Sequence, residues 1–153
     1  MLKKLLYVSL FGSAVVVSGV AALQYRLAIG PLLIALGVLV LLGLGLARRP
    51  LRGAIPDLVF GSIDTGLLTI PALWGGALFG VPGAIAGGVI GDALTDAIAG
   101  FFEGSVAQWL QKKDFESGRE PVTTALGKMA GCLLGAGLVL CVALLFGIRP
   151  AFD

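Results

Sequence analysis

The sequence predicts an all-α, polytopic membrane helix bundle of about five transmembrane helices, forming one domain over residues 1–153. Composition is the first reason, since 58% of the residues are hydrophobic and only 13% are charged, whereas a soluble domain carries about 25% charged residues. Segment length is the second, because several apolar runs reach the ~20 residues that a helix needs to cross a bilayer. The third is the uneven distribution of basic residues between loops, which is typical of a multi-pass protein of the cell inner (plasma) membrane.

Five segments qualify as spans, and turn-forming or interfacial residues bound them. The first resembles the apolar core of a signal peptide behind Lys3 and Lys4, but we interpret it as an uncleaved span. Gly80 and Pro82 favour a turn between the third and fourth spans, and Pro121 suits a helix start before the fifth. The expected spans are residues 5–23, 27–47, 58–79, 83–102 and 125–147.

Residues 104–122 are expected to form a cytoplasmic loop that contains a short interfacial helix. Val106, Trp109 and Leu110 recur at helical spacing and are followed by two lysines, a pattern typical of a helix lying on a membrane surface. Residues 114–120 are the only segment whose composition resembles that of a solvated loop.

Basic residues set the orientation of the bundle. Arg26 and Arg149 lie on one side, and the other nine lie on the opposite side: Lys3, Lys4, Arg48, Arg49, Arg52, Lys112, Lys113, Arg119 and Lys128. By the positive-inside rule the N-terminus is cytoplasmic and the C-terminus lies outside, which requires an odd number of spans. Because topology accounts for the nine basic residues, we expect no nucleic-acid partner.

Glycines recur at four-residue steps in two of the expected spans, at Gly83, Gly87 and Gly91 and again at Gly127, Gly131 and Gly135. Small residues at this spacing let helix backbones approach closely in lipid. The pattern fits packing inside one bundle, and it also fits self-association or docking onto a membrane-complex partner.

Acidic residues are concentrated in the hairpin formed by the third and fourth spans. Five of the nine lie there, and no lysine or arginine occurs between Ala54 and Gln111. The five are Asp57, Asp64, Asp92, Asp96 and Glu103. The 3.6-residue period places those of each span on one helix face.

A turn near Gly80 brings together residues whose numbers add to about 160. This register pairs Asp57 with Glu103 near the cytoplasmic interface, and Asp64 with Asp96 about 10 Å deeper. A carboxylate costs ~2.5–3.5 kcal/mol at the centre of a transmembrane helix, so such residues usually line a functional path. Asp57 and Glu103 also suit purely interfacial positions, where a helix dipole or the headgroups accommodate them.

We therefore assign Asp64, Asp92 and Asp96, with Thr65 and Thr95, to a cation or proton path, and Asp57 and Glu103 to its cytoplasmic vestibule. The three aspartates are also the candidate metal ligands. Carboxylate oxygens favour hard divalent cations such as Mg2+, Mn2+ or Fe2+, and the chain has no histidine. The alternative is a structural network in which Ser62, Thr65, Thr69 and Thr95 satisfy the carboxylates.

Two motifs in this hairpin resemble a known family. Gly61-Ser-Ile-Asp64-Thr-Gly66-Leu-Leu-Thr69 and Gly91-Asp92-Ala-Leu-Thr95-Asp96-Ala-Ile-Ala-Gly100 resemble the first hairpin of vacuolar iron transporter-like proteins, over about residues 57–104. The resemblance implies proton-driven exchange of divalent iron or manganese, with Asp64 in the pore and residues 92–96 beside it.

The chain departs from that family in three respects. Asp96 stands near the place of the family's pore methionine, a short loop with Asp114, Glu116 and Glu120 replaces its glutamate-rich helices, and two extra spans precede the hairpin. The assignment of the carboxylates above does not depend on this resemblance.

The leading functional hypothesis is passage of a small cation, a divalent metal or a proton, through an oligomer, because one hairpin supplies too little wall for a pore. The alternative is a non-transporting accessory or assembly subunit of a larger membrane complex, packed through the Gly-xxx-Gly faces. We expect no enzyme, no catalytic residue and no resident cofactor, because the basic phosphate clamps of Mg2+-dependent membrane enzymes are missing.

Overall fold

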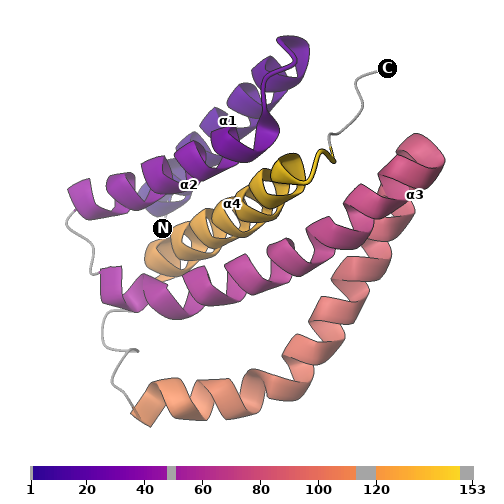
Figure 1. Ribbon diagram of the computed structural model, residues 1–153. Helices are drawn as coiled ribbons and strands as arrows, with labels where there is room; N and C mark the ends of the chain where they lie inside the picture. Colours follow the sequence, from indigo (N-terminus) through magenta and orange to yellow (C-terminus); the bar gives the residue numbers. More distant parts are fainter. Residues whose placement is uncertain (1, 48–50, 113–119, 149–153) are drawn as a thin grey trace.

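The computed structural model describes residues 2–47, 51–112 and 120–148, without the side chains of residues 3 and 99–112. Within these ranges the protein is all-helical (Figure 1). The elements are α1 (Leu2–Gln24), α2 (Ile29–Leu46), the short 3-10 helix η1 (Leu51–Ala54), α3 (Ile55–Lys112) and α4 (Pro121–Leu145). In the described part of the chain, four helices are long and apolar enough to cross a membrane.

Helix α3 is folded back on itself at Gly80, whose φ of 62° and ψ of −146° interrupt the helix. A residue with a Cβ rarely adopts such a backbone conformation, so glycine is required there. The turn divides α3 into a first arm, residues 55–79, and a second arm, residues 81–112, which lie antiparallel (Figure 1). Pro82 falls in the first turn of the second arm, where its missing N–H has no intrahelical partner to lose.

The short helix predicted at residues 105–113 is not a separate element, because the second arm continues without interruption to Lys112. Apart from Gly104 just before it, nothing in that stretch opposes helix formation. Figure 1 shows that the ribbon bends before this last part of α3. Of the predicted solvated loop at residues 114–120, residues 114–119 lie outside the described residues.

Helix α4 packs between α2 and the first arm of α3. Gly127, Gly131 and Gly135 contact Ala54, Leu58 and Ser62 at a constant offset of 73, so α4 runs parallel to the first arm. Gly30 and Gly37 of α2 contact Cys141 and Leu134 of α4, which makes α2 antiparallel to α4. Helix α1 lies outside this layer and contacts α2 through Phe11, whose ring lies against Gly43.

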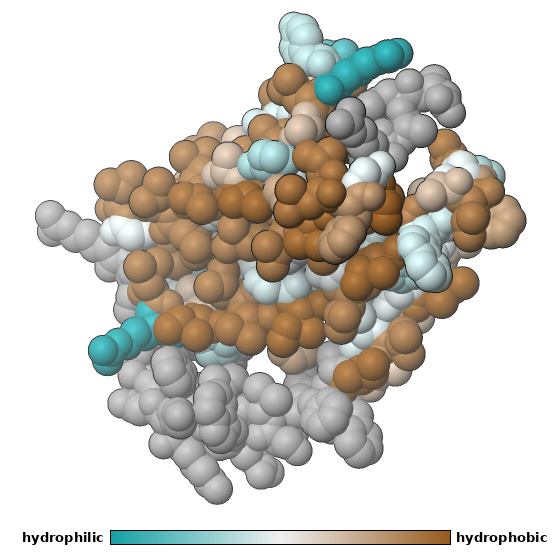
Figure 2. All heavy atoms as spheres, in the orientation of Figure 1, coloured by the Kyte–Doolittle hydropathy of each residue, from teal (hydrophilic) through white to brown (hydrophobic). Residues whose placement is uncertain are grey.

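The main cluster of buried apolar side chains lies where α1, α3 and α4 begin and α2 ends. Leu44 and Leu126 are fully buried, and Val40, Ala54, Val122 and Ala130 complete the core cluster. A 3.2 Å ion pair joins Lys4 Nζ of α1 to Glu120 Oε2 before α4 at this end. The outer faces of the helices carry exposed leucine, valine and isoleucine, and Figure 2 shows a predominantly hydrophobic surface with strongly hydrophilic atoms at its ends.

The glycine repeats identified in the sequence both lie at helix crossings within the chain. A methyl group on Gly131 or Gly135 would overlap the carbonyl oxygen of Leu58 or Ser62 in the first arm of α3. Methyl groups on Gly83 and Gly87 would overlap the carbonyl oxygens of Gly75 and Pro71 across the α3 hairpin. These contacts agree with packing inside one bundle, which was one of the interpretations that the sequence left open for the glycine repeats.

Candidate functional site

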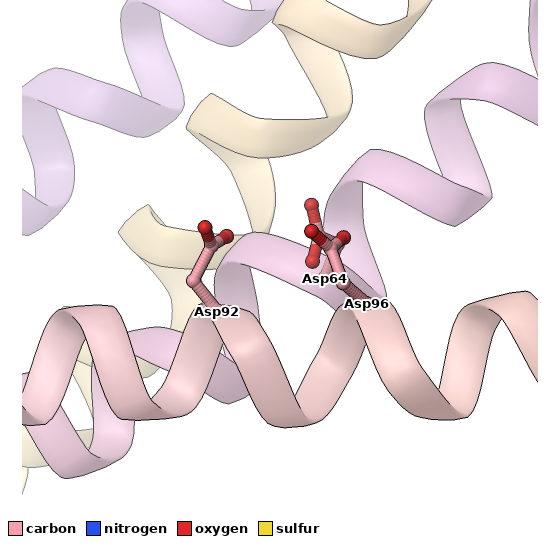
Figure 3. A group of neighbouring side chains, drawn as sticks. All are labelled: Asp64, Asp92 and Asp96. Carbon is pink, nitrogen blue, oxygen red and sulfur yellow. The ribbon is translucent and has the colours of Figure 1, made fainter.

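Three carboxylates converge where the arms of α3 face each other. Asp64 belongs to the first arm, and Asp92 and Asp96 lie one turn apart on the second (Figure 3). One carboxylate oxygen from each lies within 4.8 Å of one from each of the other two. Asp64 is half-buried, whereas Asp92 and Asp96 are exposed on the surface of the single chain.

Glycines make this convergence possible, because they bring the two arms of the hairpin into backbone contact. A Cβ on Gly91 would approach Pro71 Cγ at 2.7 Å and Leu68 Cα at 2.9 Å, and a Cβ on Gly87 would overlap the carbonyl oxygen of Pro71. Asp92 follows the last of these glycines by one residue. A four-residue glycine repeat on one arm thus sets the distance between carboxylates on both arms.

The observed register of the hairpin is close to the predicted one. Contacting pairs such as Gly83 with Gly75, Gly91 with Leu68 and Gly76 with Ala84 have numbers that add to 158, 159 and 160, and the prediction was about 160. Within this register Thr95 donates to Asp64, and an oxygen of Asp96 also lies within 4.8 Å of one of Asp64. A shift of one residue rotates a helical side chain by 100°, so the exact partner could not be read from the approximate turn position.

Thr95 links the two arms through its hydroxyl group. Its Oγ1 lies 2.7 Å from Asp64 Oδ1 and 3.0 Å from the backbone oxygen of Asp92, and the side chain is only 6% exposed. A threonine hydroxyl has one proton and can donate to one of these acceptors at a time. Donation to Asp64 holds one oxygen of that carboxylate and leaves the other available to a ligand.

The other predicted hydroxyl groups do not bond to the carboxylates. Ser62 Oγ donates either to Leu58 O at 2.8 Å or to Gly131 O at 3.2 Å, and so can join the first arm to α4. Thr69 Oγ1 donates to Thr65 O at 2.6 Å, one turn back along the same arm. The alternative prediction was a network in which several hydroxyl groups satisfy the carboxylates. Among the described residues, Thr95 is the only member of that network with a hydrogen bond to one of the three aspartates.

The predicted vestibule is described only in part. Asp57 lies in the first turn of α3 and is 8% exposed, so it is more buried than expected for a carboxylate in a headgroup region. Glu103 continues the helix of the second arm, but its side chain lies outside the described residues. The predicted pairing of these two carboxylates therefore stays a prediction.

The site offers oxygen ligands, and the hairpin has no lysine or arginine between Ala54 and Gln111. Two ligand atoms on opposite sides of a cation with bonds of about 2.1–2.5 Å lie roughly 4–5 Å apart. A spacing of at most 4.8 Å is therefore compatible with one cation in contact with all three carboxylates. The exposure of Asp92 and Asp96 leaves room for water to complete the coordination shell, as Mg2+ and similar ions require.

Sequence reasoning singled out these aspartates from their positions on the helix faces and Thr95 as a possible partner of the carboxylates, but it missed two polar links elsewhere. Tyr7 OH donates to Gly43 O at 3.0 Å, joining α1 to α2, and Lys4 pairs with Glu120. Neither has a local sequence signal, because the partners lie 36 and 116 residues apart.

Comparison of the chain with protein-family models, curated proteins and solved structures finds no match. The site must therefore be interpreted from its own chemistry.

Proposed function

We propose that this protein is an integral membrane protein that passes a small cation, a divalent metal or a proton, through the site formed by Asp64, Asp92 and Asp96. The observation that carries the proposal is the convergence of their oxygens within 4.8 Å in a segment that has no lysine or arginine between Ala54 and Gln111. Carboxylates so close together repel one another when ionised, and a shared proton or a bound cation relieves that repulsion.

Their position in the chain supports a membrane-embedded site. Asp64 lies nine residues into the first arm and Asp92 and Asp96 lie in the middle of the second, among exposed apolar side chains such as Ile63, Val89 and Leu94. Carboxylates in such surroundings are costly unless they face water, a cation or another polar group. A cation path supplies water, a cation and further polar groups.

The membrane placement that goes with this function has five spans, because the two arms of α3 cross separately. Helix α1, the first arm and α4 then run outward from the cytoplasm, and α2 and the second arm run back. Asp92 and Asp96 are exposed in one copy, and we infer that an oligomer encloses the path around them. Asp57 and Glu103 line its cytoplasmic entrance.

Ion flux into proteoliposomes tests the proposal. Purified protein in phosphatidylcholine vesicles is given Mn2+, Mg2+ or Fe2+ outside, or a proton gradient, and uptake is followed with a trapped fluorescent indicator. We expect the parent to transport at least one of these ions, and Asp64→Asn and Asp96→Asn to lose that flux, because each removes a negative charge from the site.

Glu120→Gln is the matched control, since it removes a carboxylate outside the hairpin, and it should transport like the parent. Parental flux in both aspartate variants would contradict the mechanism.

The rival function, an accessory subunit held by its glycine faces, has less support. Both glycine repeats already contact other parts of the same chain, so a partner would have to dock elsewhere. The accessory-subunit function predicts that Asp→Asn variants still co-purify with the partner and that the purified chain transports no ion.

A further inference from the structure

Thr95 is buried beside the three carboxylates, although two of them are exposed. Its side chain is 6% exposed, whereas Asp92 and Asp96 on the same arm are exposed. Its Oγ1 lies 2.7 Å from Asp64 Oδ1 on the opposite arm and 3.0 Å from the backbone oxygen of Asp92. A cation of the Mg2+ type keeps several water ligands, for which a side chain buried to this extent leaves no room. Thr95 therefore contacts two of the candidate ligand residues without being placed to bind a hydrated cation itself.

The hydroxyl proton of Thr95 favours Asp64 over the backbone of Asp92. One proton serves the two acceptors, and a carboxylate accepts a stronger hydrogen bond than a neutral carbonyl group does. The contact with Asp64 is also the shorter of the two. Donation ties Asp64 Oδ1, on the first arm, to the arm that carries Asp92 and Asp96. It thereby restricts rotation of the carboxylate group while an oxygen of Asp64 lies within 4.8 Å of one from each of the other two.

Thr69 offers an internal comparison with Thr95. It lies on the first arm with Asp64 and is 9% exposed, so the two threonines are buried to a similar extent. Its Oγ1 donates to Thr65 O at 2.6 Å, within the same arm. Removal of either hydroxyl group costs one buried hydrogen bond, but only removal of the Thr95 hydroxyl group releases a carboxylate.

We propose that Thr95 is a positioning residue for the carboxylate site, and that its hydroxyl group holds Asp64 in the orientation in which the three aspartates bind one divalent cation. This role rests on the proposed function and applies to its divalent-metal form. A proton can be shared by two carboxylates, whereas a divalent cation needs several oxygen ligands at set distances. Groups that hydrogen-bond to metal ligands typically contribute about 10- to 100-fold to metal affinity. Thr95 thus acts through Asp64 and is not itself part of the path, as the sequence analysis expected.

Mn2+ binding to the purified full-length protein in detergent micelles tests this role, with the electron paramagnetic resonance signal of free Mn2+ as the readout. We expect Thr95→Val to raise the dissociation constant for Mn2+ about 10-fold, because Asp64 keeps its charge but loses its orientation. Thr95→Ser retains the hydroxyl group and should bind Mn2+ like the parent. Thr69→Val is the matched control and should also bind like the parent. Circular dichroism and elution volume select variants that retain the parental fold.

Mn2+ uptake into proteoliposomes gives a second readout, which a purely structural role would not move. Loss of positioning in Thr95→Val raises the Mn2+ concentration that gives half-maximal uptake. Loss of folded protein would lower the maximal rate and leave that concentration unchanged.

Separate outcomes distinguish failure of this role from failure of the proposed function. Parental Mn2+ affinity in Thr95→Val, or an equal loss of affinity in Thr95→Val and Thr69→Val, would overturn the role of Thr95 alone. A parent that passes protons but binds no Mn2+ would also overturn it and leave the proposed function standing. Parental binding by Asp64→Asn, or a parent that neither binds Mn2+ nor passes any cation, would overturn both.

Discussion

Thr95 is the residue that connects the two arms of the α3 hairpin at the carboxylates. Thr95→Val keeps the shape of the side chain but leaves Asp64 Oδ1 without its 2.7 Å hydrogen bond. Hydrogen bonds inside membrane bundles contribute about 0.5–2 kcal/mol, so we expect the free energy of unfolding to fall by about that amount. Denaturant unfolding in detergent micelles measures it.

Thr95→Ser is the control for this prediction, because it retains the hydroxyl group and should unfold within experimental error of the parent. If the valine and serine variants are equally stable, the hydrogen bond between Thr95 and Asp64 contributes nothing to the hairpin.

Arg26 occupies a backbone conformation that suits glycine. Its φ is 52°, and the hydrogen bonds from Arg26 N to Leu23 O and from Leu27 N to Ala22 O form a Schellman motif after α1. A residue with a side chain adopts the left-handed region at a cost of roughly 1–2 kcal/mol. Glycine avoids this cost, but its greater conformational freedom in the unfolded chain offsets part of the gain in stability. We expect Arg26→Gly to raise the unfolding temperature, whereas Arg26→Ala should not.

At the scale of the elements, the contact between α4 and the first arm of α3 depends on having no side chains at its centre. A methyl group on Gly131 would overlap Leu58 O, whereas a methyl group on Gly19 of α1 meets no heavy atom within 4 Å. We expect Gly131→Ala to destabilise the protein by about 1–3 kcal/mol through overpacking. Gly19→Ala should stabilise it by up to about 1 kcal/mol, because alanine favours a helix interior over glycine.

Thermal unfolding of both alanine variants, followed by circular dichroism, measures this contrast. Effects of the same sign at the two positions would show that helix propensity, rather than the close crossing of α3 and α4, governs the response.

The hairpin in α3 was predictable because its turn has a local chemical signal. Gly80 and Pro82 mark the turn, and the four-residue glycine repeat marks the face that the second arm presents to the first. Pro121 marked the start of α4 correctly, whereas the continuation of α3 to Lys112 was predicted as a separate short helix. Hydropathy defines the apolar part of a helix, whereas backbone hydrogen bonding extends the helix into polar sequence beyond it.

At the scale of the whole molecule, the helix directions are consistent with the positive-inside orientation. Lys4 at the start of α1 pairs with Glu120 before α4, and Arg52 lies in η1 before α3, so these basic residues gather at one end of the bundle. A reporter that is active only outside the cytoplasm should therefore be active when fused after residue 153 and inactive when fused at residue 1.

Equal reporter activity at the two ends would indicate an even number of spans, with the two arms of α3 not crossing the membrane separately.

By itself the sequence determined the class of protein, the apolar segments, the turn at Gly80 and the acidic face of each arm. All of these are local properties, since hydropathy, glycine content and helical period are each read within about 20 residues. The same local reading left open whether the glycine repeats pack inside one chain and which residue lies opposite Asp64.

Only the tertiary structure decided those two questions. It brings Gly131 against Leu58 and Gly87 against Pro71, and it sets Thr95 opposite Asp64 with Asp92 and Asp96 beside them. The physical reason is that a partner across a helix crossing depends on rotation and register. A shift of one residue changes the rotation by 100°, while the hydrophobic pattern that identifies a span hardly changes.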